Sequence, residues 1–289
     1  MSTITNKLLD TCDLGWFSIR PRALSGALCW VKETIDGNHR RYACFCEASL
    51  LSNVSTNPSV AKVLRGADEV FPDGIAMVLL ARLMGHRLPA RIPGPSFLPA
   101  ACEYGVALGW RHFFYGGGPG VADRLAGIMS ARYPGLKVVG TCAPPFRGLT
   151  SDELADVKRR IEDSKADILW VCLGSPKQEL WVAENVGKIE VPLMMPVGAA
   201  FDFHAGERPW APSWVRRIGM EWLFRTFTGG RRTFWRNLRC VTVVAWILLG
   251  TMVRVMFGKK PFPPKGALSE PVSKLVNRLL QTTCILAFV

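Results

Sequence analysis

Short apolar runs alternate with longer segments in which apolar residues recur at helical spacing over about the first 200 residues. These runs predict β-strands at Tyr42–Glu47, Arg111–Tyr115, Leu136–Gly140, Asp167–Leu173 and Val191–Val197. Several of them are apolar throughout, which is typical of strands that helices cover on both faces of a sheet. The pattern therefore predicts an α/β fold built around a parallel sheet.

Polar residues and prolines mark where the predicted helices begin. Thr150 and Glu153 match a capping box, in which each side chain bonds a backbone N–H at the start of the helix. Asn57-Pro58, Gly94-Pro95 and Gly118-Pro119 each place an N-cap residue before a proline, which favours the first helical position. We therefore expect a helix to follow each of these sites.

The junction after Leu173 carries the clearest signal for a ligand site. A predicted strand stops at Gly174, and Ser175, Pro176 and Gln178 then match an N-cap, a first helical residue and a Ser-x-x-Gln capping box. Such a turn directs free backbone N–H groups and the positive end of a helix dipole into a cleft at the strand's carboxyl end. An anion such as a nucleotide diphosphate is expected to bind there.

A second glycine-rich turn, Gly116-Gly117-Gly118-Pro119-Gly120, follows the strand predicted to end at Tyr115. Two such turns on one sheet favour an enzyme over a scaffold. Val121 stands where a dinucleotide-binding fingerprint needs its third glycine, no acidic residue follows about 20 positions on, and no Walker motif occurs. Hydride transfer and P-loop chemistry are therefore disfavoured.

Several polar residues near these turns allow two interpretations each. Asp73, in Pro72-Asp73-Gly74, could be an N-cap or a carboxylate that takes a proton from an attacking hydroxyl. Arg91 and Lys177 could be solvated surface cations or could neutralise a phosphate. Gln178 could cap its helix only, or could also offer its amide to a ligand. Residue chemistry alone leaves these alternatives open.

The net charge of +13 is unevenly distributed along the chain. Residues 1–204 hold 22 basic and 20 acidic side chains, whereas residues 205–265 hold 12 and 2. In the basic segment Lys and Arg alternate with Trp and Phe, the composition of a helix that lies on an anionic membrane. Nucleic acid is the alternative partner, and the tryptophans make it less attractive.

Composition also divides the chain into a body (1–206), a basic membrane-associating appendage (207–265) and a short tail (266–289). The uncharged stretch Cys240–Val253 is shorter than the roughly 20 residues that cross a bilayer. It is expected to lie in the interface or to pack on a partner, with a spanning helix as the alternative. The N-terminus lacks a signal-peptide pattern and the nine cysteines are irregularly spaced, which predicts a cytoplasmic protein with reduced thiols. Its expected location is the inner face of the cell membrane.

The chain also carries an ordered set of motifs: Pro72-Asp73-Gly74, Arg91-x-x-Gly94, Phe114 to Ala122, Gly174-x-Pro-Lys-Gln-Glu179, Val197 to Asp202 and Glu221 to Arg225. Across residues 40–240 this set resembles the WecG/TagA/CpsF glycosyltransferases. The resemblance implies a Rossmann-like α/β body and a C-terminal appendage that brings the active site to the membrane. It also implies sugar transfer from a nucleotide donor to a polyprenyl-diphosphate-linked saccharide in bacterial surface polysaccharide synthesis.

By the same resemblance, Asp73 matches the catalytic base, and the segment from Gly174 to Glu179 matches the donor-site motif. Four appendage arginines would meet the membrane or the lipid diphosphate: Arg225, Arg231, Arg232 and Arg236. The chain departs from the family pattern where many members have Thr-x-Asn, Gly-x-Asp, Asp-Gly-Tyr-Phe and Arg-Ala-Pro. The residues here are Phe45-Cys46-Glu47, Gly94-Pro95-Ser96, Ala143-Pro144-Pro145-Phe146 and Trp210-Ala-Pro.

The combined prediction is an inverting glycosyltransferase that moves a hexose-type sugar from a nucleotide-diphosphate donor, expected to be uridine-linked. Asp73 would deprotonate the acceptor, and helix N-termini would stabilise the leaving diphosphate without an obligatory metal or other cofactor. The expected donor-binding residues are Arg91, Gly116, Gly117, Gly118, Gly174, Lys177, Gln178 and Glu179. A membrane-recruited nucleotide-sugar-binding protein without catalysis is the alternative. The identity of the sugar, the linkage and any homo-oligomer are left open.

Overall fold

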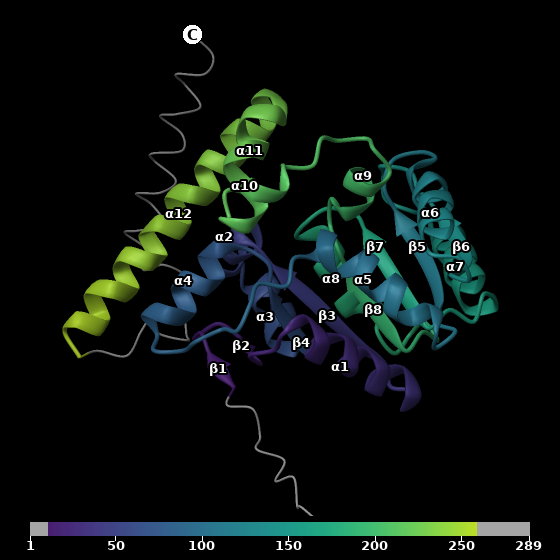
Figure 1. Cartoon of the computed structure of the whole chain (residues 1–289), viewed down its shortest axis with the longest axis horizontal. Coiled ribbons are helices and arrows are strands. Elements are labelled where there is room, and N and C mark those ends of the chain that lie inside the picture. The colour runs from purple at the N-terminus through teal and green to yellow at the C-terminus, as the bar shows by residue number, and fades with distance from the viewer. Residues whose placement is uncertain (1–10, 259–289) are drawn as a thin grey trace, which may run out of the picture.

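A computed structural model describes residues 11–258 and contains a six-stranded parallel sheet with helices on both faces (Figure 1). The sheet order is β4-β3-β8-β7-β5-β6. The strands are β3 Arg41–Cys46, β4 Glu69–Pro72, β5 Arg111–Gly116, β6 Lys137–Cys142, β7 Ile168–Cys172 and β8 Leu193–Pro196. The predicted α/β fold is confirmed, and the five predicted strands lie within two residues of their observed bounds. The prediction omitted β4, whose four residues are too short to show a period.

Alternate strand residues enter one of two hydrophobic clusters, because successive side chains of a strand point to opposite faces. One face is covered by α1 Leu24–Asp36, α5 Gly94–Val106, α6 Val121–Arg132 and α9 Ala200–His204. The other is covered by α2 Ala48–Thr56, α3 Pro58–Gly66, α4 Ile75–Leu83, α7 Ser151–Asp163 and α8 Lys177–Asn185. A small antiparallel pair, β1 Cys12–Asp13 and β2 Ser18–Ile19, precedes the sheet.

Some of the predicted helix starts are confirmed and others are wrong. Thr150 and Glu153 form the reciprocal capping box of α7, and Asn57 caps α3 by accepting a hydrogen bond from the Ser59 N–H. In contrast, α5 begins at Gly94 itself, and α6 begins only after Gly120. Gly120 has a φ of 73°, so the chain makes a left-handed turn after Pro119 before it becomes helical.

The segment after α9 forms α10 Ser213–Arg217, α11 Glu221–Thr228 and the long helix α12 Gly230–Met256. Helix α12 packs against α2 and α4 (Figure 1). It buries Val243, Val244 and Ile247 in the same cluster that covers one face of the sheet. The appendage therefore shares the core of the body. The predicted tail at 266–289 lies outside the described residues.

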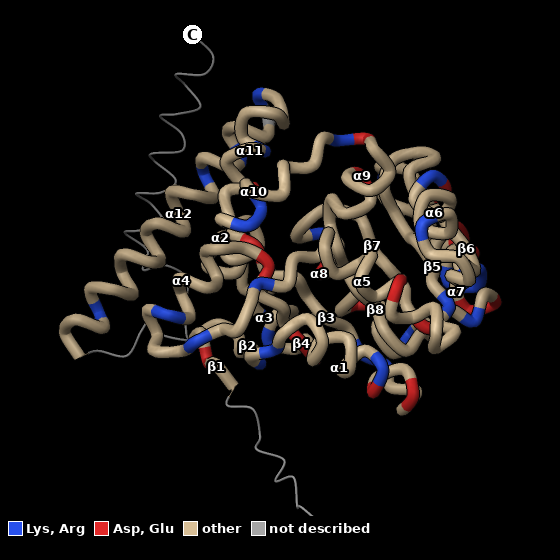
Figure 2. Tube along the Cα trace, in the orientation of Figure 1, with Lys and Arg blue, Asp and Glu red and all other residues tan. Residues whose placement is uncertain are grey.

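The opposite face of α12 is apolar and exposed. Trp235, Leu238, Trp246, Leu249, Val253 and Met256 recur there at helical spacing. By length and composition, Thr233–Met256 could cross a membrane, although 22% of its most apolar stretch is buried against the protein. The helix is longer than the uncharged stretch alone because it continues through Arg239 and Arg254. Basic residues are spaced along α10–α12 (Figure 2).

Candidate functional site

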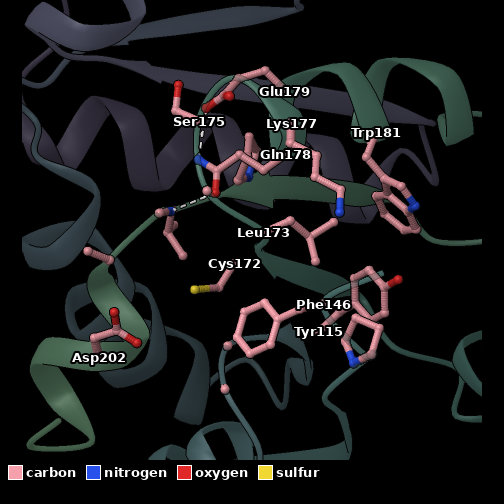
Figure 3. A pocket seen from close by; sticks show the side chains of 18 of the residues that line it. Tyr115, Phe146, Cys172, Leu173, Ser175, Lys177, Gln178, Glu179, Trp181 and Asp202 are labelled. Atoms are coloured by element: carbon pink, nitrogen blue, oxygen red, sulfur yellow. Dashed lines mark hydrogen bonds between the residues drawn. The ribbon is translucent and has the colours of Figure 1, made fainter. Parts of the chain in front are cut away.

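A pocket of about 680 Å³ opens where the carboxyl ends of β3, β4, β5, β7 and β8 meet. In a parallel sheet these ends lie at one edge, so the turns that follow them surround a common space. The volume falls within the roughly 300–1,000 Å³ of small-molecule sites. Figure 3 shows Tyr115 and Phe146 on one side of this space and Gln178 and Glu179 on the other.

The turn after β7 differs from its predicted form. Gly174 has a φ of 78°, the Ser175–Pro176 peptide bond is cis, and α8 begins at Lys177. The expected capping box between Ser175 and Gln178 is therefore wrong: Ser175 precedes the N-cap, and the Gln178 amide bonds elsewhere. Its Oε1 accepts from the Gly198 N–H at 3.2 Å, and its Nε2 donates to Glu179 Oε1 at 2.8 Å (Figure 3). Gln178 thus joins the turns that follow β7 and β8.

Glu179 is a buried carboxylate beside this amide. Burial raises its pKa to about 7, and the hydrogen bond from Gln178 opposes that rise. Near neutral pH the side chain can therefore gain or lose a proton inside the pocket wall. A buried acid so close to an expected diphosphate site affects the charge that a donor meets.

The turn after β5 begins with glycines, so no side chains cover its backbone. A Cβ on Gly116 would lie 2.2 Å from the Cys172 carbonyl oxygen, so only glycine fits where β5 passes the end of β7. The Gly117 N–H donates to that same carbonyl at 2.8 Å. Gly117 and Gly118 line the pocket, whereas Gly116 lies outside the lining and permits the close approach of the strands.

Asp73 follows β4 and lies half-buried in the pocket wall. The interpretation of Asp73 as the N-cap of α4 is wrong, because Gly74 holds that position. The Asp73 Oδ2 instead accepts from the Gly94 N–H at 3.2 Å, the first amide of α5. Burial and the nearby Glu47 carboxylate raise its pKa to about 7, while Arg225 and the Gly94 N–H oppose the rise. Such a carboxylate is suited to accept a proton near neutral pH.

Arg225 brings the appendage to this end of the pocket. Its guanidinium lies 2.8 Å from Glu221 Oε1 and 3.6 Å from Glu47 Oε2, and 4.8 Å from the Phe203 ring centroid. Trp210 donates its indole N–H to Glu221 at 3.2 Å. Trp210 also stacks under the Arg216 guanidinium at 3.8 Å. These aromatic and charged contacts hold α10 and α11 against the body.

The other predicted site residues are distributed between the pocket and the surface. Gly174, Lys177 and Arg236 line the pocket. Arg91 lies outside the lining and donates to the Arg216 carbonyl, which joins the body to α10. Arg231 is exposed outside the lining, and the side chain of Arg232 lies outside the described part of the chain.

Many residues of the lining were absent from the predicted site, among them Glu47, Tyr115, Phe146 and Trp181. The Tyr115 and Trp181 rings lie 4.8 Å apart, and Phe146 is 86% exposed at the pocket. Two local signals were available, because Tyr115 immediately precedes the triglycine and Trp181 lies one helical turn after Lys177. Glu47 and Phe146 were visible only as departures from the family pattern.

Known proteins are similar to this chain over most of its length. The model of the glycosyl transferase WecG/TagA/CpsF family matches residues 14–256. A relative in Bacillus spizizenii, named N-acetylglucosaminyldiphosphoundecaprenol N-acetyl-beta-D-mannosaminyltransferase, is 29% identical over 63% of this chain and 68% of its own. Relatives of the same name in Bacillus subtilis and Staphylococcus aureus are 28% and 25% identical, over 70% and 63% of this chain and 75% and 70% of theirs. With a family match over most of its length, the chain belongs to the WecG/TagA/CpsF family and is a glycosyltransferase.

Proposed function

We propose that this enzyme transfers an N-acetylhexosaminyl group from a uridine-diphosphate donor to a polyprenyl-diphosphate-linked saccharide, with inversion at the anomeric carbon. The names of the bacterial relatives support both the sugar class and the lipid-linked acceptor. The observation that carries the proposal is that Asp73 and the two glycine-rich turns line one and the same pocket. That arrangement supplies a base and a diphosphate site in one space.

The reaction follows from this arrangement. Ionised Asp73 takes the proton of the acceptor hydroxyl, whose oxygen attacks the anomeric carbon. The bond from that carbon to the donor diphosphate breaks on the opposite side, so a single displacement inverts the configuration. The leaving diphosphate keeps the bonding electrons, and its charge is stabilised by backbone amides near Gly118, by the first turn of α8 and by Lys177.

The exposed face of α12 supports attachment to an anionic membrane. Trp214, Ile218 and Phe227 add exposed apolar surface on α10 and α11, next to the arginines of the same helices. Because α12 packs lengthwise on α2 and α4, a spanning α12 would bring those helices into the hydrocarbon. An interfacial position on the cytoplasmic face leaves the body in water and its pocket near the lipid headgroups.

The activity is tested by incubating the full chain with a panel of nucleotide sugars and a synthetic polyprenyl-diphosphate-linked N-acetylglucosamine. We expect a product heavier by one N-acetylhexosamine residue, formed from a uridine-linked donor. Donor binding without product from any nucleotide sugar would support the non-catalytic alternative and overturn the proposal.

Membrane attachment is tested on two surface variants, Trp235→Ser and Trp246→Ser, because truncation would remove Val243, Val244 and Ile247 and uncover the hydrophobic core that they pack against. Binding to phosphatidylglycerol vesicles should fall several-fold relative to the wild type. Ile128→Ser, which changes an exposed apolar residue on α6, is the matched control and should bind normally. Equal vesicle binding by all four proteins would contradict the proposed surface.

A further inference from the structure

Glu47 lies beside the base candidate and has no assigned role. It follows β3 directly, and Asp73 follows the neighbouring strand β4, where Cys46 and Pro72 are register partners. The two carboxylates therefore leave the same edge of the sheet from adjacent strands, and both line the pocket. Two like charges in one pocket wall disfavour each other's ionised forms, so this arrangement needs a compensating cation.

That cation comes from the appendage. Arg225 of α11 lies 3.6 Å from Glu47 Oε2, although Glu221 on its own helix already pairs with it at 2.8 Å. The contact with Glu221 is local, four residues away, and holds Arg225 to its own helix only. Glu47 is the acidic contact that fixes the guanidinium relative to the sheet. Arg225 is about a quarter exposed, so its charge remains accessible from the pocket.

The charged groups around Asp73 come from three elements. Glu47 begins the turn after β3, Glu221 and Arg225 belong to α11, and Arg236 of α12 also lines the pocket. The Cys46 thiol is another titratable neighbour, and burial raises its pKa well above the usual value, so it stays neutral. Glu47 and Glu221 favour the protonated form of Asp73, and Arg225 favours the ionised form.

We propose that Glu47 is a positioning residue of the transfer reaction, which holds Arg225 at the acceptor end of the pocket and makes the adjacent Asp73 a stronger base. The inference rests on the proposed role of Asp73 as the base. Arg225, held in this way, offers a fixed positive charge to the acceptor diphosphate.

The test compares Glu47→Gln with Arg225→Gln in the full chain. Without the Glu47 charge, the acid limb of the kcat/KM profile should move to lower pH by about half a unit or more, because a like charge beside Asp73 is lost. Without the Arg225 charge, the limb should move to higher pH. The KM for the lipid-linked acceptor should rise several-fold in both variants, and Glu47→Asp should restore part of the loss.

Two controls keep the outcomes distinct. Glu103→Gln removes an exposed carboxylate outside the pocket and should leave both the limb and the KM unchanged. The Asp73 carboxyl is also titrated by carbon-13 NMR in wild type and Glu47→Gln, and its signal is identified by its absence in Asp73→Asn. This measurement requires no turnover. A wild type without product refutes the proposed function, whereas an Asp73 titration that is the same in wild type and Glu47→Gln refutes the role of Glu47.

Discussion

Two acids in the pocket wall, Asp73 and Glu179, have pKa values raised to about 7, yet their surroundings differ. Asp73 lies among charges, with Glu47 raising its pKa further and Arg225 opposing the rise. Glu179 is more deeply buried, and the contacts that oppose the rise in its pKa are hydrogen bonds, chiefly the one from the Gln178 amide. Under the proposed function, the raised pKa of Asp73 prepares a base at the acceptor end, and the raised pKa of Glu179 limits negative charge near the donor diphosphate.

The largest expected effect is on turnover, and it should differ between variants of the two acids. Asp73→Asn should lower turnover at least 100-fold, within the roughly 10²–10⁴ range of general-base catalysis, because the amide cannot accept the acceptor's proton. Glu179→Gln should retain most of the turnover. Product formation measures both, and calorimetry with a nucleotide sugar should give near wild-type donor affinity for Asp73→Asn. Equal losses of turnover in the two variants would remove the distinction.

A smaller effect is expected from the amide that holds Glu179. Gln178→Ala removes the bonds to Gly198 and Glu179, which leaves buried polar groups unpaired at a cost of about 1–3 kcal/mol. Donor affinity should fall about tenfold because the turns after β7 and β8 lose their connection. Gln178→Glu is the size-matched comparison, and it should weaken the donor further by adding negative charge. Unchanged donor affinity in both would show that the network does not shape the donor end.

The pH dependence of the two ends should have opposite signs. Turnover should rise as pH increases through about 7, because Asp73 must be ionised to act as a base. Affinity for a non-transferable nucleotide-sugar analogue should fall over the same range, because ionised Glu179 repels the diphosphate. Glu179→Gln should flatten only the second curve. Parallel curves in the wild type would contradict the assignment of one acid to each end.

The smallest effect concerns stability. Both acids have a higher pKa in the folded protein than the ordinary values of 3.8 and 4.5, so the wild type loses stability as pH rises from about 4 to 7. Asp73→Asn and Glu179→Gln remove this loss. Their Tm gains should therefore be larger at pH 8 than at pH 5 in both variants. A gain independent of pH would exclude titration as its cause.

The sequence was sufficient for five of the six strands and for the positions of the two glycine turns, because apolar periodicity and glycine placement are local signals. The predicted capping box of Ser175 is wrong because the Gln178 side chain bonds other groups in the turns around it. A sequence motif shows only the local partner, so it does not reveal which hydrogen bonds Gln178 makes in the fold. Glu47 was missed for a similar reason: its cation, Arg225, lies far along the chain. The composition boundary at 206 likewise hid the packing of Val243 and Ile247 into the core.

Both ends of the loop between β6 and α7 are held by contacts that do not depend on the residues in the middle of the loop. One end leaves the parallel pairing of β5 and β6, and the other enters the Thr150–Glu153 capping box, which Arg147 braces through Glu153. Between them, Pro144, Pro145 and Phe146 line the pocket. Replacing this loop with the corresponding segment of a relative would therefore change which ligands the pocket prefers, while the sheet and its helices keep their structure.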